Sequence, residues 1–163
     1  MPPKNEPGAP RGGSIVERTS DREVVVRRQF KAPARLVFAA WTTAELFQRW
    51  WVPKSAPVTL LSCELDVRVG GGYRLRFAMP GHGEMEFFGR YLEVVPDRRL
   101  SWTNEEEGGG AVTTVTLEEA DGVTTLVLHE LHPSKEALDA ALESGAYDGM
   151  AETMAQLGAG LAG

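Results

Sequence analysis

The order of elements in this chain is decided by residues 31–53, KAPARLVFAAWTTAELFQRWWVP. Pro33 suits the first turn of a helix, because its ring fixes φ at a helical value and its missing N–H would have no partner there. Behind it, apolar residues recur at three- and four-residue spacings: Leu36, Val37, Ala40 and Trp41. Thr42 or Thr43 can cap a second helix, which Pro53 ends. The stretch therefore predicts two short helices that directly follow a strand.

Seven segments of the chain have the composition or the alternation of β-strands. They are residues 22–31, 58–67, 73–79, 85–95, 100–104, 112–118 and 123–131. In the third segment the apolar side chains share one face, and Arg74 and Arg76 fall on the opposite face, where we expect them to be solvated. Asp121-Gly122 is a strong signal for a hairpin between the last two strands.

Residues 134–161 contain no proline, and we predict that they form one long helix with Ser134 as its N-cap. An apolar stripe on this helix can pack against the sheet: Leu138, Leu142, Met150, Met154, Leu157 and Leu161. Gly145 and Gly149 interrupt the helix, each at a cost of about 1 kcal/mol relative to Ala. Either they only let the helix curve or, together with the small Ala146, they leave space between helix and sheet.

An ordered set of short motifs extends over about residues 22–162. They are Ala32-Pro33 with Val37-Phe38 and Ala40-Trp41-Thr42, Trp50-Trp51-x-Pro53, Asp66-x-Arg68-x-Gly70-Gly71, Gly89-x-Tyr91-x-Glu93-Val94, Arg99-Leu100-x-x-Thr103, Asp121-Gly122-x-Thr124 and Ser144-Gly145-x-x-x-Gly149. In this order they resemble the START-like (SRPBCC) helix-grip superfamily, in particular the branch named after the activator of heat-shock-protein-90 ATPase. That branch often has Trp after the second helix glycine, where this chain has Met150.

The resemblance implies an α+β helix-grip fold: a curved antiparallel sheet of about six or seven strands around a long C-terminal helix. The order of predicted elements agrees, because a doubly wound sheet needs helices that alternate with parallel strands. The superfamily holds its ligands between the helix and the sheet. It has many functions, so the resemblance indicates architecture and leaves the chemistry open.

Length and composition predict one domain, because 163 residues with 42% hydrophobic content suffice for one core. We expect a flexible N-terminal tail at residues 1–20 and a single START-like domain at residues 21–163. The tail has four Pro, three Gly and few large apolar groups, so it can bury little on ordering. Ile15 and Val16 could instead pair with an edge strand.

Charge and cysteine content limit the partners and the compartment. A net charge of −6 argues against a nucleic-acid or anionic-membrane partner, because either would favour a basic surface. Cys63 is the only cysteine, and no apolar run approaches the roughly 20 residues of a membrane helix. The N-terminus also lacks the apolar core of a signal peptide. These features predict a cytoplasmic protein, and the excess of Arg over Lys suggests a bacterial genome rich in G and C.

Residues that face inward by strand alternation, with others from the helices, are candidates for the wall of a cavity. They are Trp51, Tyr73, Leu75, Phe77, Phe87, Tyr91, Trp102, Leu128, Glu130, Met150 and Met154. Aromatic rings offer flat faces and Met adapts its shape, so this mixture suits a small apolar or amphipathic molecule. The same residues would also suit a closed core.

Glu130 shares strand parity with Leu126 and Leu128, so a regular strand would point its carboxylate inward, where it needs a partner. It would then be a hydrogen-bond anchor or an acid/base group. The alternative is that Glu130 lies at the solvent-exposed end of the strand or forms a salt bridge with an arginine. We predict no metal, because His129 and His132 lie on opposite faces of a strand and are one residue short of the zincin spacing. No nucleophile elbow, P-loop or dinucleotide fingerprint occurs, so no cofactor and no catalytic residue are assigned.

Three functions remain; the resemblance implies binding, and no catalytic motif favours an enzyme. The first is binding of a small hydrophobic or amphipathic ligand between the sheet and the C-terminal helix. The second is a cavity enzyme of the cyclase, dehydratase or hydrolase kind, for which Glu130, Tyr91 and Tyr73 are the first suspects. The third is a chaperone-ATPase-activator-like interaction module, although the chain has no evident second domain to grip a chaperone. An exposed edge strand would also be compatible with a homodimer.

Overall fold

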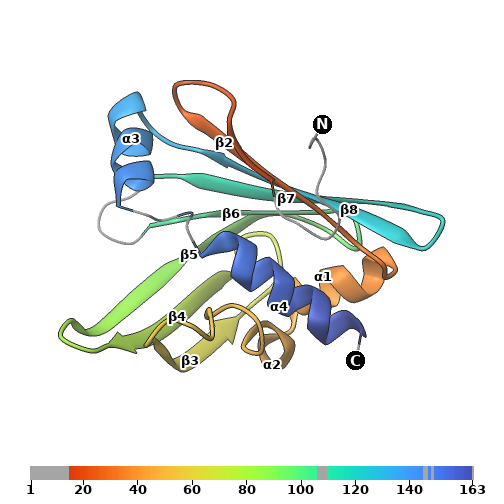
Figure 1. Cartoon of the computed structure of the whole chain (residues 1–163), viewed down its shortest axis with the longest axis horizontal. Coiled ribbons are helices and arrows are strands. Elements are labelled where there is room, and N and C mark those ends of the chain that lie inside the picture. Colours follow the sequence, from red (N-terminus) through yellow and green to blue (C-terminus); the bar gives the residue numbers. More distant parts are fainter. Residues whose placement is uncertain (1–14, 106–109, 145–146, 148, 163) are drawn as a thin grey trace.

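Eight antiparallel strands form one sheet in a computed structural model that describes residues 15–105, 110–144, 147 and 149–162. The strands are β1 (Ile15–Arg18), β2 (Glu23–Phe30), β3 (Thr59–Leu65), β4 (Gly72–Met79), β5 (Gly83–Val95), β6 (Arg99–Thr103), β7 (Val112–Ala120) and β8 (Val123–Leu131). Their order in the sheet is β1-β2-β8-β7-β6-β5-β4-β3. The sheet curls so that β2 and β8 lie on one side of helix α4 (Met150–Ala162) and β3 and β4 lie on the other (Figure 1).

Two short helices follow β2, as the sequence predicts: α1 (Ala34–Thr42) and α2 (Ala44–Phe47). Pro33 is the N-cap of α1. The N–H of Ala34, which has no partner within the helix, donates to the Glu119 carboxylate at 2.8 Å. Thr43 is the N-cap of α2 by position, but its side chain makes no capping hydrogen bond. Glu119 on β7 therefore fixes the start of α1, because it satisfies an N–H that a helix leaves without a partner.

The single long helix predicted for residues 134–161 is wrong. The structure has α3 (Lys135–Glu143), with Ser144 as its C-cap, and then the separate α4. Ser134 caps α3, because its hydroxyl accepts from the N–H of Ala137 at 3.0 Å. A Cβ at Gly149 would lie 3.2 Å from the ring of Pro53, so close approach is one reason for glycine there. Gly145 and Ala146 lie outside the described residues.

The predicted number of about six or seven strands is also wrong, because the described residues already form eight. All seven predicted segments form strands, and the additional one is β1, which pairs with β2 in the register Val16 to Val26. For residues 15–18 the alternative of edge-strand pairing therefore holds. Residues 1–14 of the predicted tail lie outside the described residues.

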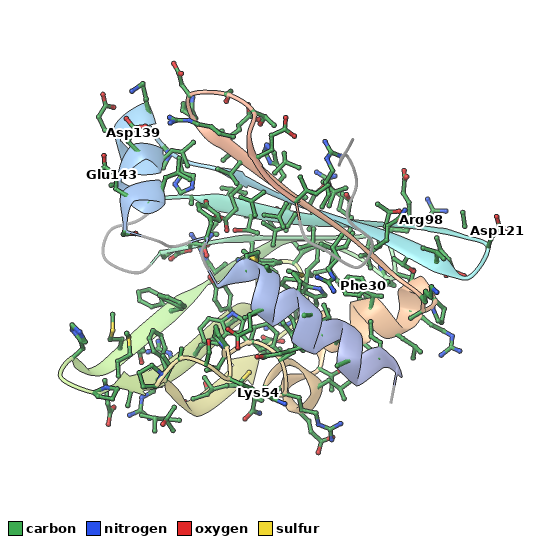
Figure 2. All side chains as sticks on the ribbon, viewed as in Figure 1. Phe30, Lys54, Arg98, Asp121, Asp139 and Glu143 are labelled. Atoms are coloured by element: carbon green, nitrogen blue, oxygen red, sulfur yellow. The ribbon has the colours of Figure 1, made fainter. Side chains whose placement is uncertain are left out.

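The core lies between the concave face of the sheet and the helices. Val26 and Leu126 on the sheet, Val37 on α1 and Met154 on α4 are all fully buried. Each such side chain contributes about 1.5–3 kcal/mol by leaving water. Phe30, at the end of β2, lies beside α4, where a Cβ on Gly158 would meet its ring at 3.4 Å (Figure 2).

The convex face of β4 and β5 carries ion pairs. Arg74 pairs with Glu86 at 2.8 Å and Arg76 with Glu84 at 2.5 Å. Arg74 is exposed and Arg76 is partly exposed, so both meet solvent as expected, and each ion pair joins neighbouring strands. Exposed pairs of this kind contribute only about 0–1 kcal/mol each, so they add little to stability and leave this part of the face nearly neutral.

Candidate functional site

A cavity of about 470 Å³ lies between the concave face of the sheet, the segment after α2 and helix α4. The structure brings all eleven candidate residues to its wall: Trp51, Tyr73, Leu75, Phe77, Phe87, Tyr91, Trp102, Leu128, Glu130, Met150 and Met154. Strand alternation positions those on β4, β5, β6 and β8, since alternate residues of a strand share a face. That these residues contact a ligand stays a prediction.

Aromatic rings in mutual contact form much of this wall. The ring of Trp51 lies edge-on to Phe87 at 5.6 Å between centroids, and Phe77 lies 4.9 Å from Phe87. Trp41 and Trp102 are 5.7 Å apart on another part of the wall. Such tilted and edge-to-face pairs are the favourable arrangements of aromatic side chains. Interlocked rings therefore hold a preformed apolar surface.

Apart from Trp51, sequence reasoning missed the part of the wall that comes from α1, α2 and the segment after α2. Trp41, Phe47 and Trp50 lie there, and the indole N–H of Trp50 donates to the carbonyl of Ala40 at 3.0 Å. These residues have the spacing of ordinary helix core, so the local pattern holds no signal for a cavity. All four tryptophans of the chain line the cavity.

Glu130 points into the cavity and is held by two hydroxyl groups. It lies opposite Thr113 in the register of β7 and β8. The Thr113 hydroxyl donates to Oε2 at 2.7 Å, and the Tyr147 hydroxyl donates to Oε1 at 2.6 Å. The expected inward orientation is therefore found, and its hydrogen-bond partners are hydroxyls rather than an arginine.

His132 is linked to Glu130 through Tyr147. Its Nε2 lies 2.8 Å from the Tyr147 hydroxyl oxygen and 3.9 Å from Oε1 of Glu130. Because the single hydroxyl hydrogen of Tyr147 goes to Glu130, His132 is the donor to the Tyr147 oxygen. Burial, and then the negative charge of Glu130, raise the pKa of Tyr147, so its phenol keeps its proton.

The cluster continues along the wall through β6 and β7. The amide nitrogen of Asn104 donates to the Thr113 hydroxyl at 2.9 Å and to the carbonyl of Ala111 at 3.1 Å. The Tyr73 hydroxyl donates to the carbonyl of Thr103 at 2.7 Å, and its oxygen lies 3.3 Å from Oδ1 of Asn104. We call the six side chains that share these bonds the polar cluster: Tyr73, Asn104, Thr113, Glu130, His132 and Tyr147.

Four members of the polar cluster were not candidates in the sequence. Thr113 shares strand parity with Val115 and Leu117, whose apolar side chains mark the inner face of β7, so alternation could have found it. Tyr147 lies between α3 and α4, in a stretch predicted as continuous helix. The sequence pattern therefore did not indicate that its side chain faces the cavity. Asn104 is the last residue of the predicted strand 100–104 and shares parity with Trp102, so alternation could have found it too, whereas His132 follows the end of β8, where alternation no longer applies.

Metal-binding geometry is absent from the part of the chain that the structure describes, where no group of three or more His, Cys, Asp or Glu side chains converges. His129 and His132 face opposite sides of the sheet. His129 pairs with Glu23 at 2.8 Å, whereas His132 belongs to the polar cluster. Within the described residues, no helix is long and apolar enough to cross a membrane.

Residues 31–162 match the family described as "Activator of Hsp90 ATPase homolog 1-like protein". The chain belongs to this family. None of the proteins with curated descriptions matches the chain. The match confirms the resemblance to the START-like branch that the sequence motifs indicated.

Solved structures of the same fold are similar over almost the whole chain. A Rhodobacter sphaeroides protein is 23% identical, with 91% of this chain and 97% of that one covered at a TM-score of 0.83. A Chromobacterium violaceum protein is 28% identical, with 86% and 97% covered at 0.72. The AHSA1-like protein from Aeromonas hydrophila is 19% identical, with 85% and 94% covered at 0.68. These likenesses establish the fold.

In this AHSA1-like chain, two side chains of α4 hold the segment that covers one side of the cavity. The amide nitrogen of Gln156 donates to the carbonyls of Trp50 and Val52, both at 2.9 Å, and its oxygen accepts from the N–H of Lys54 at 2.8 Å. One turn earlier, Glu152 accepts from the N–H and the hydroxyl of Ser55. The segment therefore moves with α4 unless these bonds break.

Two other titratable groups near the cavity are held in their neutral forms. Burial is the main cause that raises the pKa of Tyr91, which lines the cavity. Burial and the charge of Glu64 raise the pKa of the Cys63 thiol to about 11. A thiol with such a pKa is a poor nucleophile at neutral pH, because the thiolate is the reactive form. Cys63 therefore packs as a small apolar residue.

Proposed function

We propose that this protein binds a small hydrophobic or amphipathic molecule in the cavity between the sheet and α4. One observation carries the proposal: a space of about 470 Å³ whose wall is mostly apolar and aromatic, with a single hydrogen-bonded polar cluster. Ligand pockets typically enclose about 300–1,000 Å³ and combine an apolar wall with a few polar groups. A core without a ligand would gain more from filling this volume with side chains.

The direct test is native mass spectrometry of the purified protein, compared with its denatured mass. A discrete extra mass that disappears on denaturation supports bound ligand. The neutral fluorescent dye N-phenyl-1-naphthylamine provides a second measurement, because its emission rises when it enters an apolar site.

A pair of variants locates the binding. Ala141 on α3 lines the cavity, whereas the adjacent Ala140 is exposed. Ala141→Phe is expected to fill part of the cavity and to reduce dye binding, and Ala140→Phe is the matched control. If both folded variants bind the dye as the unchanged protein does, the cavity is not the binding site.

Catalysis in the same cavity is a second candidate, favoured by one observation. The chain of hydrogen bonds from His132 through Tyr147 to Glu130 joins an imidazole to a carboxylate on the cavity wall. Such a chain can supply or remove a proton at a bound molecule. Incubation of the captured ligand with the protein would test this, and a product that Glu130→Gln fails to form would favour an enzyme. A chaperone-directed role stays a prediction of the family resemblance.

A further inference from the structure

The hydrogen bonds that reach Glu130, directly or through one other side chain, all run toward its carboxylate. The Thr113 hydroxyl and the Tyr147 hydroxyl each donate their only hydrogen to the Glu130 carboxylate. His132 donates through Nε2 to Tyr147, and Asn104 donates through its amide nitrogen to Thr113. The cluster therefore ends in an acceptor.

The remaining donors of the cluster are also in use. The second amide hydrogen of Asn104 goes to the carbonyl of Ala111, and the Tyr73 hydroxyl donates to the carbonyl of Thr103. A hydroxyl has one hydrogen to donate and an amide group has two. These three hydroxyl hydrogens and two amide hydrogens are thus committed within the protein, and none of the five is left for a ligand.

Glu130 still has acceptor capacity toward the cavity. An ionised carboxylate offers about four lone-pair positions, and two hydroxyls occupy about two of them. The side chain of Glu130 lines the cavity and is 21% exposed, so part of the carboxylate faces the open space. A group that enters this end of the cavity meets a partly satisfied acceptor.

The described part of the wall supplies no Lys or Arg side chain that could receive an anion. The other side-chain N–H and O–H groups on the described wall belong to neutral side chains, namely the indoles, the Tyr91 hydroxyl and the Thr153 hydroxyl, which donates to the carbonyl of Met150. A carboxylate placed beside Glu130 would be repelled by a like charge in a site that excludes much of the water. A cation there is instead attracted by the carboxylate and by the aromatic faces.

We propose that the ligand of this cavity has an apolar body and a hydrogen-bond-donating head group, with a protonated primary amine as the best match, and that this head group binds the Glu130 carboxylate. The proposal rests on the ligand-binding function proposed above. A primary ammonium donates up to three hydrogens and neutralises the carboxylate, whereas an alcohol donates one and leaves the charge in place.

Competition against N-phenyl-1-naphthylamine with octylamine, 1-octanol and octanoate tests this. The three compounds share one chain length and differ in the head group, and an alkylamine is protonated at pH 7 as Lys is. We expect octylamine to displace the dye at a concentration about tenfold or more below that of octanoate, with 1-octanol between them.

Glu130→Gln removes the charge with little change of shape, and Glu118→Gln makes the same charge change at an exposed position of β7. In Glu130→Gln the preference for octylamine over octanoate is expected to fall about tenfold or more, and in Glu118→Gln it is expected to stay. An unchanged preference in folded Glu130→Gln would overturn the assignment of the head group to this residue. If that variant does not fold, the comparison of the three compounds on the unchanged protein decides.

The outcomes separate the two proposals. If the dye binds and octanoate displaces it as well as octylamine does, the head-group proposal is wrong and the binding function stands. If neither the dye nor any of the three compounds binds, the binding function fails, and the head-group proposal fails with it. Binding of the dye with octylamine as the best competitor supports both.

Discussion

Tyr147 joins two polar side chains through one hydroxyl, which donates to Glu130 and accepts from His132. Tyr147→Phe leaves the imidazole N–H without its acceptor and the carboxylate with one donor fewer. We expect a loss of about 1–3 kcal/mol in the free energy of unfolding, measured by urea denaturation. Tyr91→Phe is the control, because the Tyr91 hydroxyl takes part in none of the described hydrogen bonds, and we expect it to cost within about 0.5 kcal/mol. Equal losses in the two variants would contradict the role given to Tyr147.

Gly89 and Gly160 differ in the space around them. A Cβ on Gly89 would clash with the backbone carbonyl of Thr103, whose carbon lies 2.8 Å away, whereas a Cβ on Gly160 meets nothing within 4 Å. Gly89→Ala is therefore expected to destabilise the protein by about 1–3 kcal/mol, as overpacking does. Gly160→Ala, on α4, is expected to stabilise it by up to about 1 kcal/mol. Thermal unfolding of both variants checks the opposite signs, and equal signs would refute them.

Cys63 provides a test of pH dependence. Since its folded pKa is raised to about 11, the thiolate fraction of the native protein stays low through pH 8 to 10 and keeps rising with pH. Native protein at pH 8.5 is expected to react with iodoacetamide about a hundredfold more slowly than protein unfolded in urea, from the difference in pKa alone. Circular dichroism at each pH checks that the fold persists. Equal native and unfolded rates would mean that burial does not protect the thiol.

At the scale of elements, α4 holds the segment from Trp50 to Ser55 through side chains one turn apart. Gln156→Ala removes three hydrogen bonds to backbone groups of this segment. We expect a loss of about 1–3 kcal/mol and faster amide exchange at Lys54 and Ser55, with little change in β7 and β8. Gln48→Ala, at an exposed position, is the control. Unchanged exchange in Gln156→Ala would show that the segment is held by its aromatic contacts instead.

The sequence predicts elements where one pattern governs and fails where tertiary contacts decide. Alternation in 73–79 and 123–131 gives β4 and β8 and puts Glu130 on the inner face. The division of the predicted helix is different, because it depends on Tyr147 reaching Glu130 and on Pro53 packing against Gly149. Those partners lie in other elements, so helical periodicity and the absence of proline could not show the break. β1 was predicted only as an alternative for a related reason, since four exposed residues gain a strand only from pairing with β2.

At the scale of the whole molecule, the four tryptophans report on one shared interior. All four line the cavity, and they come from α1, the segment after α2 and β6. Because the sheet and α4 close around the same space, we expect tryptophan fluorescence and far-ultraviolet circular dichroism to give the same urea midpoint, as two-state unfolding requires. Distinct midpoints would mean that the region around the cavity unfolds separately from the sheet.

The place of β2 in the sheet has a consequence for the synthesis of the protein. β3 to β8 pair with neighbours along the chain, but β2 pairs with β8, so that Val26 meets Leu128 about 100 residues later. β2 leaves the ribosome first among the long strands and must wait until β8 has emerged before its buried valines find their partner. Closing so long a loop is also a slow step. During translation, therefore, the apolar Val24–Val26 segment stays uncovered for most of the time, and it is there that we expect a chaperone that assists folding to bind the nascent chain.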